Sequence, residues 1–129
     1  MSAESSLYAL LVADPDVMAL IEVSGASPSE ARAFPHKIRA DQTLPAVSYT
    51  RPTTEFNNTI HGLAPTSAEP TLEITCVAAT RTAADGLADA VLAAIVSDFI
   101  VENRFHEERD DEPEYFATVL IARTSETLA

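Results

Sequence analysis

The architecture of this chain follows from two stretches of its sequence, LPAVSYTR at residues 44–51 and LEITCVAAT at residues 72–80. In the first stretch Val47, Tyr49 and Arg51 alternate with small or hydroxyl residues, and in the second every other residue from Leu72 to Ala78 is apolar. Such alternation is the pattern of a strand with one buried face. We therefore predict two half-buried strands joined by a long connection.

A helix is predicted directly after the second strand. Thr82 is the expected N-cap, since Asp85 follows it three residues later and places an acid near the positive end of the helix. Asp85 and Asp89 are expected to point away from the apolar stripe. That stripe has helical spacing and consists of Ala84, Leu87, Ala88, Val91, Leu92 and Ile95.

The residues before the first strand predict helical structure and then a short edge strand. A helix is expected over residues 4–13, capped by Ser5 or Ser6. Pro15 interrupts it, so the pattern up to Ile21 indicates either a kinked helix or a short second helix. Residues 32–35 are expected to form an edge strand, where proline is tolerated.

Two further strands are predicted after the helix. Residues 99–108 alternate, with Val101, Asn103 and Phe105 on the same side, and a polar turn at residues 109–113 leads into a strand over residues 114–124. We therefore expect one α+β domain over residues 1–129. Its order is α-(β)-β-β-α-β-β, with a mostly antiparallel sheet of four to five strands and helices packed on one face.

Two apolar segments are candidates for contact with other proteins. A long loop is expected over residues 52–70, and large apolar residues in such a loop contact a partner or pack back on the body. The last strand has an almost continuous apolar centre, which indicates a strand covered on both faces or lying in a subunit contact. The candidate interface residues are Phe56, Ile60, Leu63, Val119 and Ile121.

Composition narrows the classes of function. The net charge of −12 argues against binding to duplex DNA, which requires cations at the phosphates, but suits a surface that DNA passes without sticking. No apolar run approaches the roughly eighteen residues of a membrane span, and residues 1–6 lack a basic signal region. Cys76, the only cysteine, is expected to be a small buried hydrophobe.

No constellation of residues predicts catalysis, a metal or a cofactor. His36, His61 and His106 lie far apart with no second ligand at metal-binding spacing, and the acidic run at residues 107–114 lacks the pattern of a calcium loop. There is no glycine-rich phosphate loop. Small tautomerases have a similar size, but Ser2 stands where their catalytic proline belongs. We expect no enzyme, no catalytic or metal residue, and no cofactor.

The order of these segments resembles the tail-completion, or tail-terminator, proteins of long-tailed phages and of phage-like gene transfer agents. The resemblance covers about residues 5 to 122. Its matching pieces are residues 7–11, 32–35, 44–49 and 72–78, the alanine-rich helix at residues 83–95, and the terminal two-strand hairpin.

This resemblance implies a structural virion protein that is made in the host cytoplasm and needs no cofactor. Such proteins form a hexameric ring that caps the head-proximal end of the tail tube, and joins the tube protein to the head connector. DNA passes through the lumen without specific binding, and no membrane is involved. The alternatives are a head-side connector or stopper protein of the same particle and a small ligand-binding α+β domain.

Overall fold

The computed structural model of the chain describes residues 2–23, 31–35, 43–57, 67–107, 115–124 and 126–127. In this part of the chain the helices are α1 (Ala3–Ala13), α2 (Pro15–Ile21) and α3 (Arg81–Ile95). The strands are β1 (Ala33–Phe34), β2 (Ala46–Asn57), β3 (Ser67–Ala78), β4 (Ile100–His106), β5 (Phe116–Arg123) and β6 (Glu126–Thr127). None of the described helices has the length and apolar character needed to cross a bilayer.

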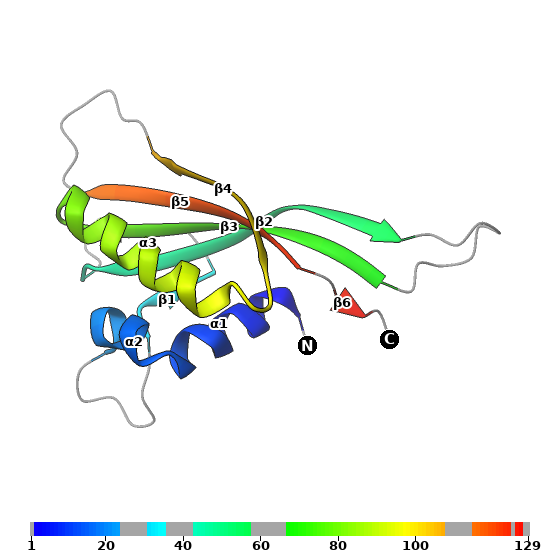
Figure 1. Cartoon of the computed structure of the whole chain (residues 1–129), viewed down its shortest axis with the longest axis horizontal. Helices are drawn as coiled ribbons and strands as arrows, with labels where there is room; N and C mark the ends of the chain where they lie inside the picture. Colours follow the sequence, from blue (N-terminus) through cyan, green and yellow to red (C-terminus); the bar gives the residue numbers. More distant parts are fainter. Residues whose placement is uncertain are drawn as a thin grey trace.

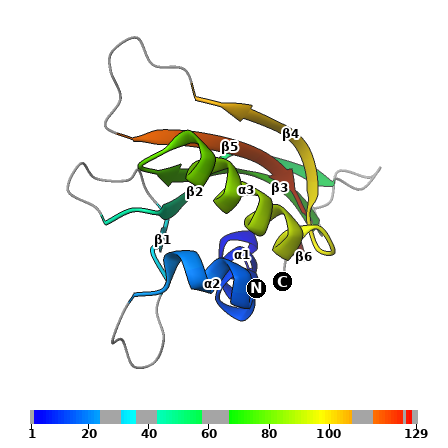
Figure 2. The same ribbon diagram turned by 60° about the vertical axis from the view of Figure 1, so that its left-hand side comes forward.

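The strands form one sheet in the order β1-β2-β3-β5-β4, and β6 pairs with the start of β3. All neighbouring strands are antiparallel except β1 and β2. The three helices lie together on one face of this sheet (Figures 1 and 2). The predicted α+β class, the element order and the placement of the helices are confirmed.

The core lies between α3 and the two central strands. Leu87, Val91 and Ile95 of α3 are fully buried in the same apolar cluster as residues of β3 and β5. The residues of β3 and β5 in this cluster are Leu72, Ile74, Cys76, Leu120 and Ala122. Burying a leucine or isoleucine side chain contributes roughly 1.5–3 kcal/mol, so this layer is the main source of stability.

The N-terminal segment forms two separate helices rather than one kinked helix. The carboxylate of Asp14 accepts from the backbone N–H groups of Asp16 at 2.9 Å and Val17 at 3.0 Å, so it caps α2 just before Pro15. The prediction for the start of α1 was wrong by one turn. Ser2 is the cap, because its hydroxyl accepts from the N–H of Ser5 at 3.1 Å.

A single arginine connects α2, the short edge strand and the start of β2. The guanidinium of Arg32 donates to the carbonyl oxygens of Leu20, Glu22 and Pro45 at 2.9, 3.0 and 2.8 Å. One side chain thus donates to three carbonyl groups at the ends of these segments and holds the segments in place. The edge strand predicted at residues 32–35 is confirmed as β1.

The loop predicted over residues 52–70 is much shorter than expected. Strands β2 and β3 continue through both of its ends, with residues 53–57 paired to residues 67–71. The prolines that suggested a loop are accommodated, since Pro52 lies at a register shift between Thr50 and Thr53, where an unpaired residue is tolerated. Residues 58–66 lie outside the described part of the chain.

The N-cap of α3 is Thr80 and not Thr82. The Thr80 hydroxyl accepts from the N–H of Ala83 at 3.1 Å, and its backbone is extended, as a cap requires. Both threonines precede the apolar stripe, so spacing alone did not separate them.

The two threonines allow a matched test. Thr80→Ala is expected to lower the free energy of unfolding by about 1 kcal/mol, because the N–H of Ala83 loses its acceptor. Thr82→Ala, at an exposed position within the helix, is expected to stay within about 0.5 kcal/mol of the wild type. Urea unfolding measures both values, and equal losses would contradict the assignment of the cap.

Candidate interaction surface

One face of the sheet carries no helix in the described part of the chain (Figures 1 and 2). On β5, Leu120 and Ala122 belong to the core under the helices, so the alternating residues Val119, Ile121 and Arg123 point to the opposite side. We call this side the open face. On β3 it includes Glu73, which lies opposite Ile121.

A bulge in the edge strand β4 brings further apolar residues to the open face. Val101 pairs with Ala122, but the register then shifts, so that Asn103 pairs with Ile121 and Phe105 with Val119. The prediction that Val101, Asn103 and Phe105 share one side is therefore wrong beyond Val101. Phe105 is 43% exposed on the open face, and Ile100, opposite Arg123, is 59% exposed.

The predicted interface residues lie in two different places. Val119 is only 2% exposed within the single chain, whereas Ile121 beside it is half-buried. Phe56 belongs to the far end of β2, and its side chain lies outside the described part, as do Ile60 and Leu63. The structure thus brings Val119 and Ile121 together on the open face and separates them from the β2–β3 end.

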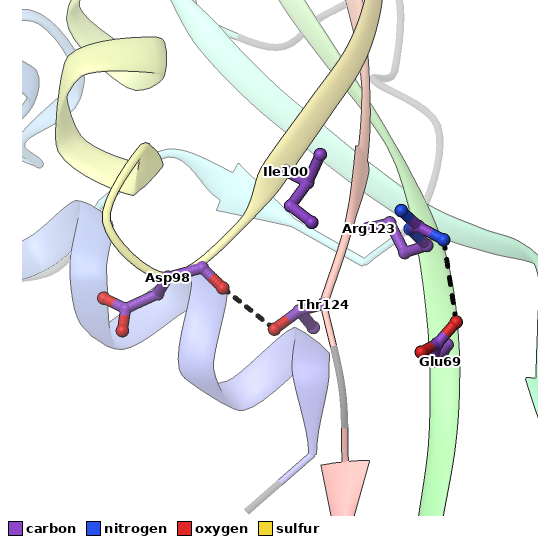
Figure 3. A pocket seen from close by; sticks show the side chains of 5 residues that line it. All are labelled: Glu69, Asp98, Ile100, Arg123 and Thr124. Carbon is purple, nitrogen blue, oxygen red and sulfur yellow. Dashed lines mark hydrogen bonds and ion pairs between the residues drawn. The ribbon is translucent and has the colours of Figure 1, made fainter. Parts of the chain in front are cut away.

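A small cavity of about 180 Å³ opens at one end of the open face, where β4 begins and β5 ends (Figure 3). Its lining residues are Glu69, Asp98, Ile100, Arg123 and Thr124. Arg123 donates through Nε to the Glu102 carboxylate at 2.9 Å and lies 3.6 Å from that of Glu69. The cavity is smaller than the roughly 300–1,000 Å³ of a typical ligand pocket.

The helix-covered side holds a polar cluster centred on Asp85. Its Oδ1 accepts from the Thr118 hydroxyl at 2.8 Å and lies 3.0 Å from His106 Nε2 and 3.8 Å from a guanidinium nitrogen of Arg104. Asp85 was expected to point away from the apolar stripe. It instead faces the sheet, where Thr118 of β5 lies against it together with Arg104 and His106, which follow the bulge in β4.

This cluster lowers the pKa of Asp85. The largest cause is the hydrogen bond from Thr118, whose side chain is fully buried, and His106 and Arg104 add to it. Arg104 also donates to Asp89 at 2.6 Å. The cluster therefore connects α3 to the last two strands through charge and hydrogen bonds rather than through apolar packing.

The described arginines all contact groups of this chain. Arg51 makes two 2.7 Å contacts with the Glu4 carboxylate, which hold the pKa of Glu4 below its usual range. Arg81 lies over the ring of Phe116, with 5.1 Å to the ring centre. Arg32, Arg104 and Arg123 make the contacts described above. Some acids form no ion pair with a described cation, and Glu73 on the open face is one of them.

The reactive side chains of the described part are dispersed. Cys76 is completely buried, as predicted, and burial raises the pKa of its thiol to about 12. Among the described residues no three His, Cys, Asp or Glu side chains are grouped as a metal site would require. Of the three histidines only His106 is described, and it belongs to the Asp85 cluster.

Sequence reasoning missed Phe105, Ile100 and Glu73 as members of one surface. The individual strands were recognisable, but a bulge and a cross-strand register leave no signal in a single sequence. Only the apolar centre of the last strand pointed to Ile121.

Comparison with known proteins identifies one family. The family model described as Tail completion protein gp17 matches residues 5–118, which is most of the chain. A comparison with curated proteins finds no match.

The Asp85 cluster predicts a pH-dependent contribution to stability. Asp85→Asn is expected to lower the free energy of unfolding at pH 7 by about 1 kcal/mol, because the amide still accepts from Thr118 but no longer attracts Arg104. The folded pKa of Asp85 lies below the unfolded value of about 3.9. The difference in the free energy of unfolding between wild type and variant is therefore complete above about pH 5. It disappears as the pH falls through the pKa of Asp85 in the folded state.

Urea unfolding at pH 7, 5 and 3 measures this difference. The matched control is Asp98→Asn, since Asp98 is exposed and forms no ion pair with a described residue. A difference that is equal at all three pH values would show that the Asp85 charge does not stabilise the fold.

Proposed function

Because the chain belongs to the Tail completion protein gp17 family, we propose that it caps the head-proximal end of a phage-type tail tube as a hexameric ring. The family is one of phage tail proteins and not of enzymes, so the protein acts in tail assembly. The match over residues 5–118 is the observation that carries the proposal. In the assembled tail the ring contacts the tail tube protein on one side and the head connector on the other.

The shape of the fold supports a role in ring formation. Strands β2 and β3 continue past the helices as a projecting arm (Figure 1), defined here as residues 53–57 and 67–71. A ring requires contacts between two different patches on neighbouring copies. We assign one of these patches to the end of the arm, where the sequence places Phe56, Ile60 and Leu63.

The charge of the chain supports passage of DNA through the ring. A net charge of −12 repels phosphates, and the described arginines are engaged within the chain. An acidic lumen lets DNA slide without specific binding. A lumen lined by arginine and lysine in an assembled particle would contradict this part of the proposal.

Deletion of the gene distinguishes a cap of the tail tube from a stopper on the head side. Loss of a cap is expected to leave tails of uncontrolled length, or tails that are not joined to heads, because nothing ends tube growth. Electron microscopy of particles from the deletion strain measures tail length and joining. Leaking heads accompanied by tails of normal length would instead identify a stopper protein.

Replacement of Phe56, Ile60 and Leu63 by serine tests the arm. The triple variant is expected to remain a folded monomer but to lose incorporation into particles, since the apolar contact between copies is removed. Circular dichroism measures folding, and immunoblotting of purified particles measures incorporation. A melted monomer would place these side chains in the core, and normal incorporation would exclude them from the contact.

A further inference from the structure

We propose that the open face binds a different protein of the particle, whose docking surface combines apolar side chains with arginine or lysine. The inference rests on the proposed function, because that function says where the partner is sought. It deepens that function by naming a surface and the chemistry that the surface recognises. It is carried by three open-face residues, Phe105, Ile121 and Glu73.

The open face has an apolar stripe along its β4–β5 side. Phe105 is 43% exposed and Ile100 is 59% exposed, and Ile121 lies between the rows that these two residues occupy. On the same face, β2 and β3 carry the hydroxyl residues Thr50 and Thr75 beside Glu73, together with the buried residues Ala46 and Val77. Large exposed aromatic and aliphatic side chains are typical of the centre of a protein interface.

The carboxylates on this face determine what can cover the stripe. Glu73 is half-buried beside Ile121 and forms no ion pair with a described residue. Near the end of the stripe, Arg123 pairs with the carboxylates of Glu69 and Glu102. A purely apolar partner would remove water from these acids without replacing it. A partner that brings a cation to Glu73 avoids that cost.

The described part of a second copy does not meet that requirement. The five described arginines contact Glu4, acids of the Asp85 cluster, acids near the cavity, backbone carbonyls or the Phe116 ring. Two copies of a chain with net charge −12 would bring acids against acids at this face. Nucleic acid is excluded by the same repulsion. The charge pattern therefore favours a basic protein surface.

The experiment uses the purified full chain and two probes, the tail tube protein and the head connector protein of the same particle. Phe105→Ser and Glu73→Gln are the face variants. The matched controls are Val96→Ser, at an apolar residue that is 64% exposed outside the open face, and Glu22→Gln, at an exposed acid after α2. Affinity is measured by biolayer interferometry at two salt concentrations, and the oligomeric state by mass photometry.

Each face variant is expected to bind one of the two probes about tenfold or more weakly, while both controls bind as the wild type does. Glu73→Gln is also expected to make the affinity less dependent on salt concentration, because it removes a charge pair. Unchanged binding to both probes, or an effect on self-association instead, would overturn the inference. If Phe105→Ser lowers the melting temperature, Ile100→Ser takes its place.

Assembly of the wild-type chain with the probes tells a failure of this inference apart from a failure of the proposed function. A wild-type chain that never assembles with either probe contradicts the cap. A chain that assembles equally well with and without the face substitutions leaves the cap intact and places the partner contact elsewhere.

Discussion

The packing of α3 on β3 and β5 is the contact on which the rest of the structure depends. Leu87 and Val91 share one buried cluster with Ile74 and Leu120, and no other described helix packs so centrally on the sheet. This contact uses one face of the sheet. On the second face Phe105 is exposed, whereas Val77 and Val119 are buried within the chain.

Charge is distributed in keeping with that division. The described arginines connect segments of the same chain: Arg51 joins α1 to β2, Arg104 joins β4 to α3, and Arg123 joins neighbouring strands at the cavity. These cations are used internally, and the whole chain has a net charge of −12. In the proposed ring an acidic surface would let DNA pass and favour basic neighbours, so one property of the composition supports both parts of the proposed role.

Much of the fold could be predicted because the patterns of β3, α3 and β5 are strong and local. Errors occurred where local signals competed. Pro52 and Pro70 suggested a loop, although a register shift and strand pairing accommodate them. The sequence favours Thr82 as the cap because Asp85 follows it three residues later, whereas the structure uses Thr80. Ile121 of the candidate surface could be predicted from its apolar neighbours in the sequence. Phe105 and Glu73 could not, because they share a face with Ile121 only through the pairing between strands.

Taken alone, the amino-acid pattern was sufficient for the elements, their order, the helix-covered side and the likeness to phage tail proteins, because periodicity and composition act over short distances along the chain. The position of Asp85 against Thr118, the switch of Phe105 to the open face and the position of Glu73 beside Ile121 all required the folded molecule. The first results from the packing of α3 on β5. The other two result from the register between paired strands, where a shift of one residue exchanges the two faces of a strand.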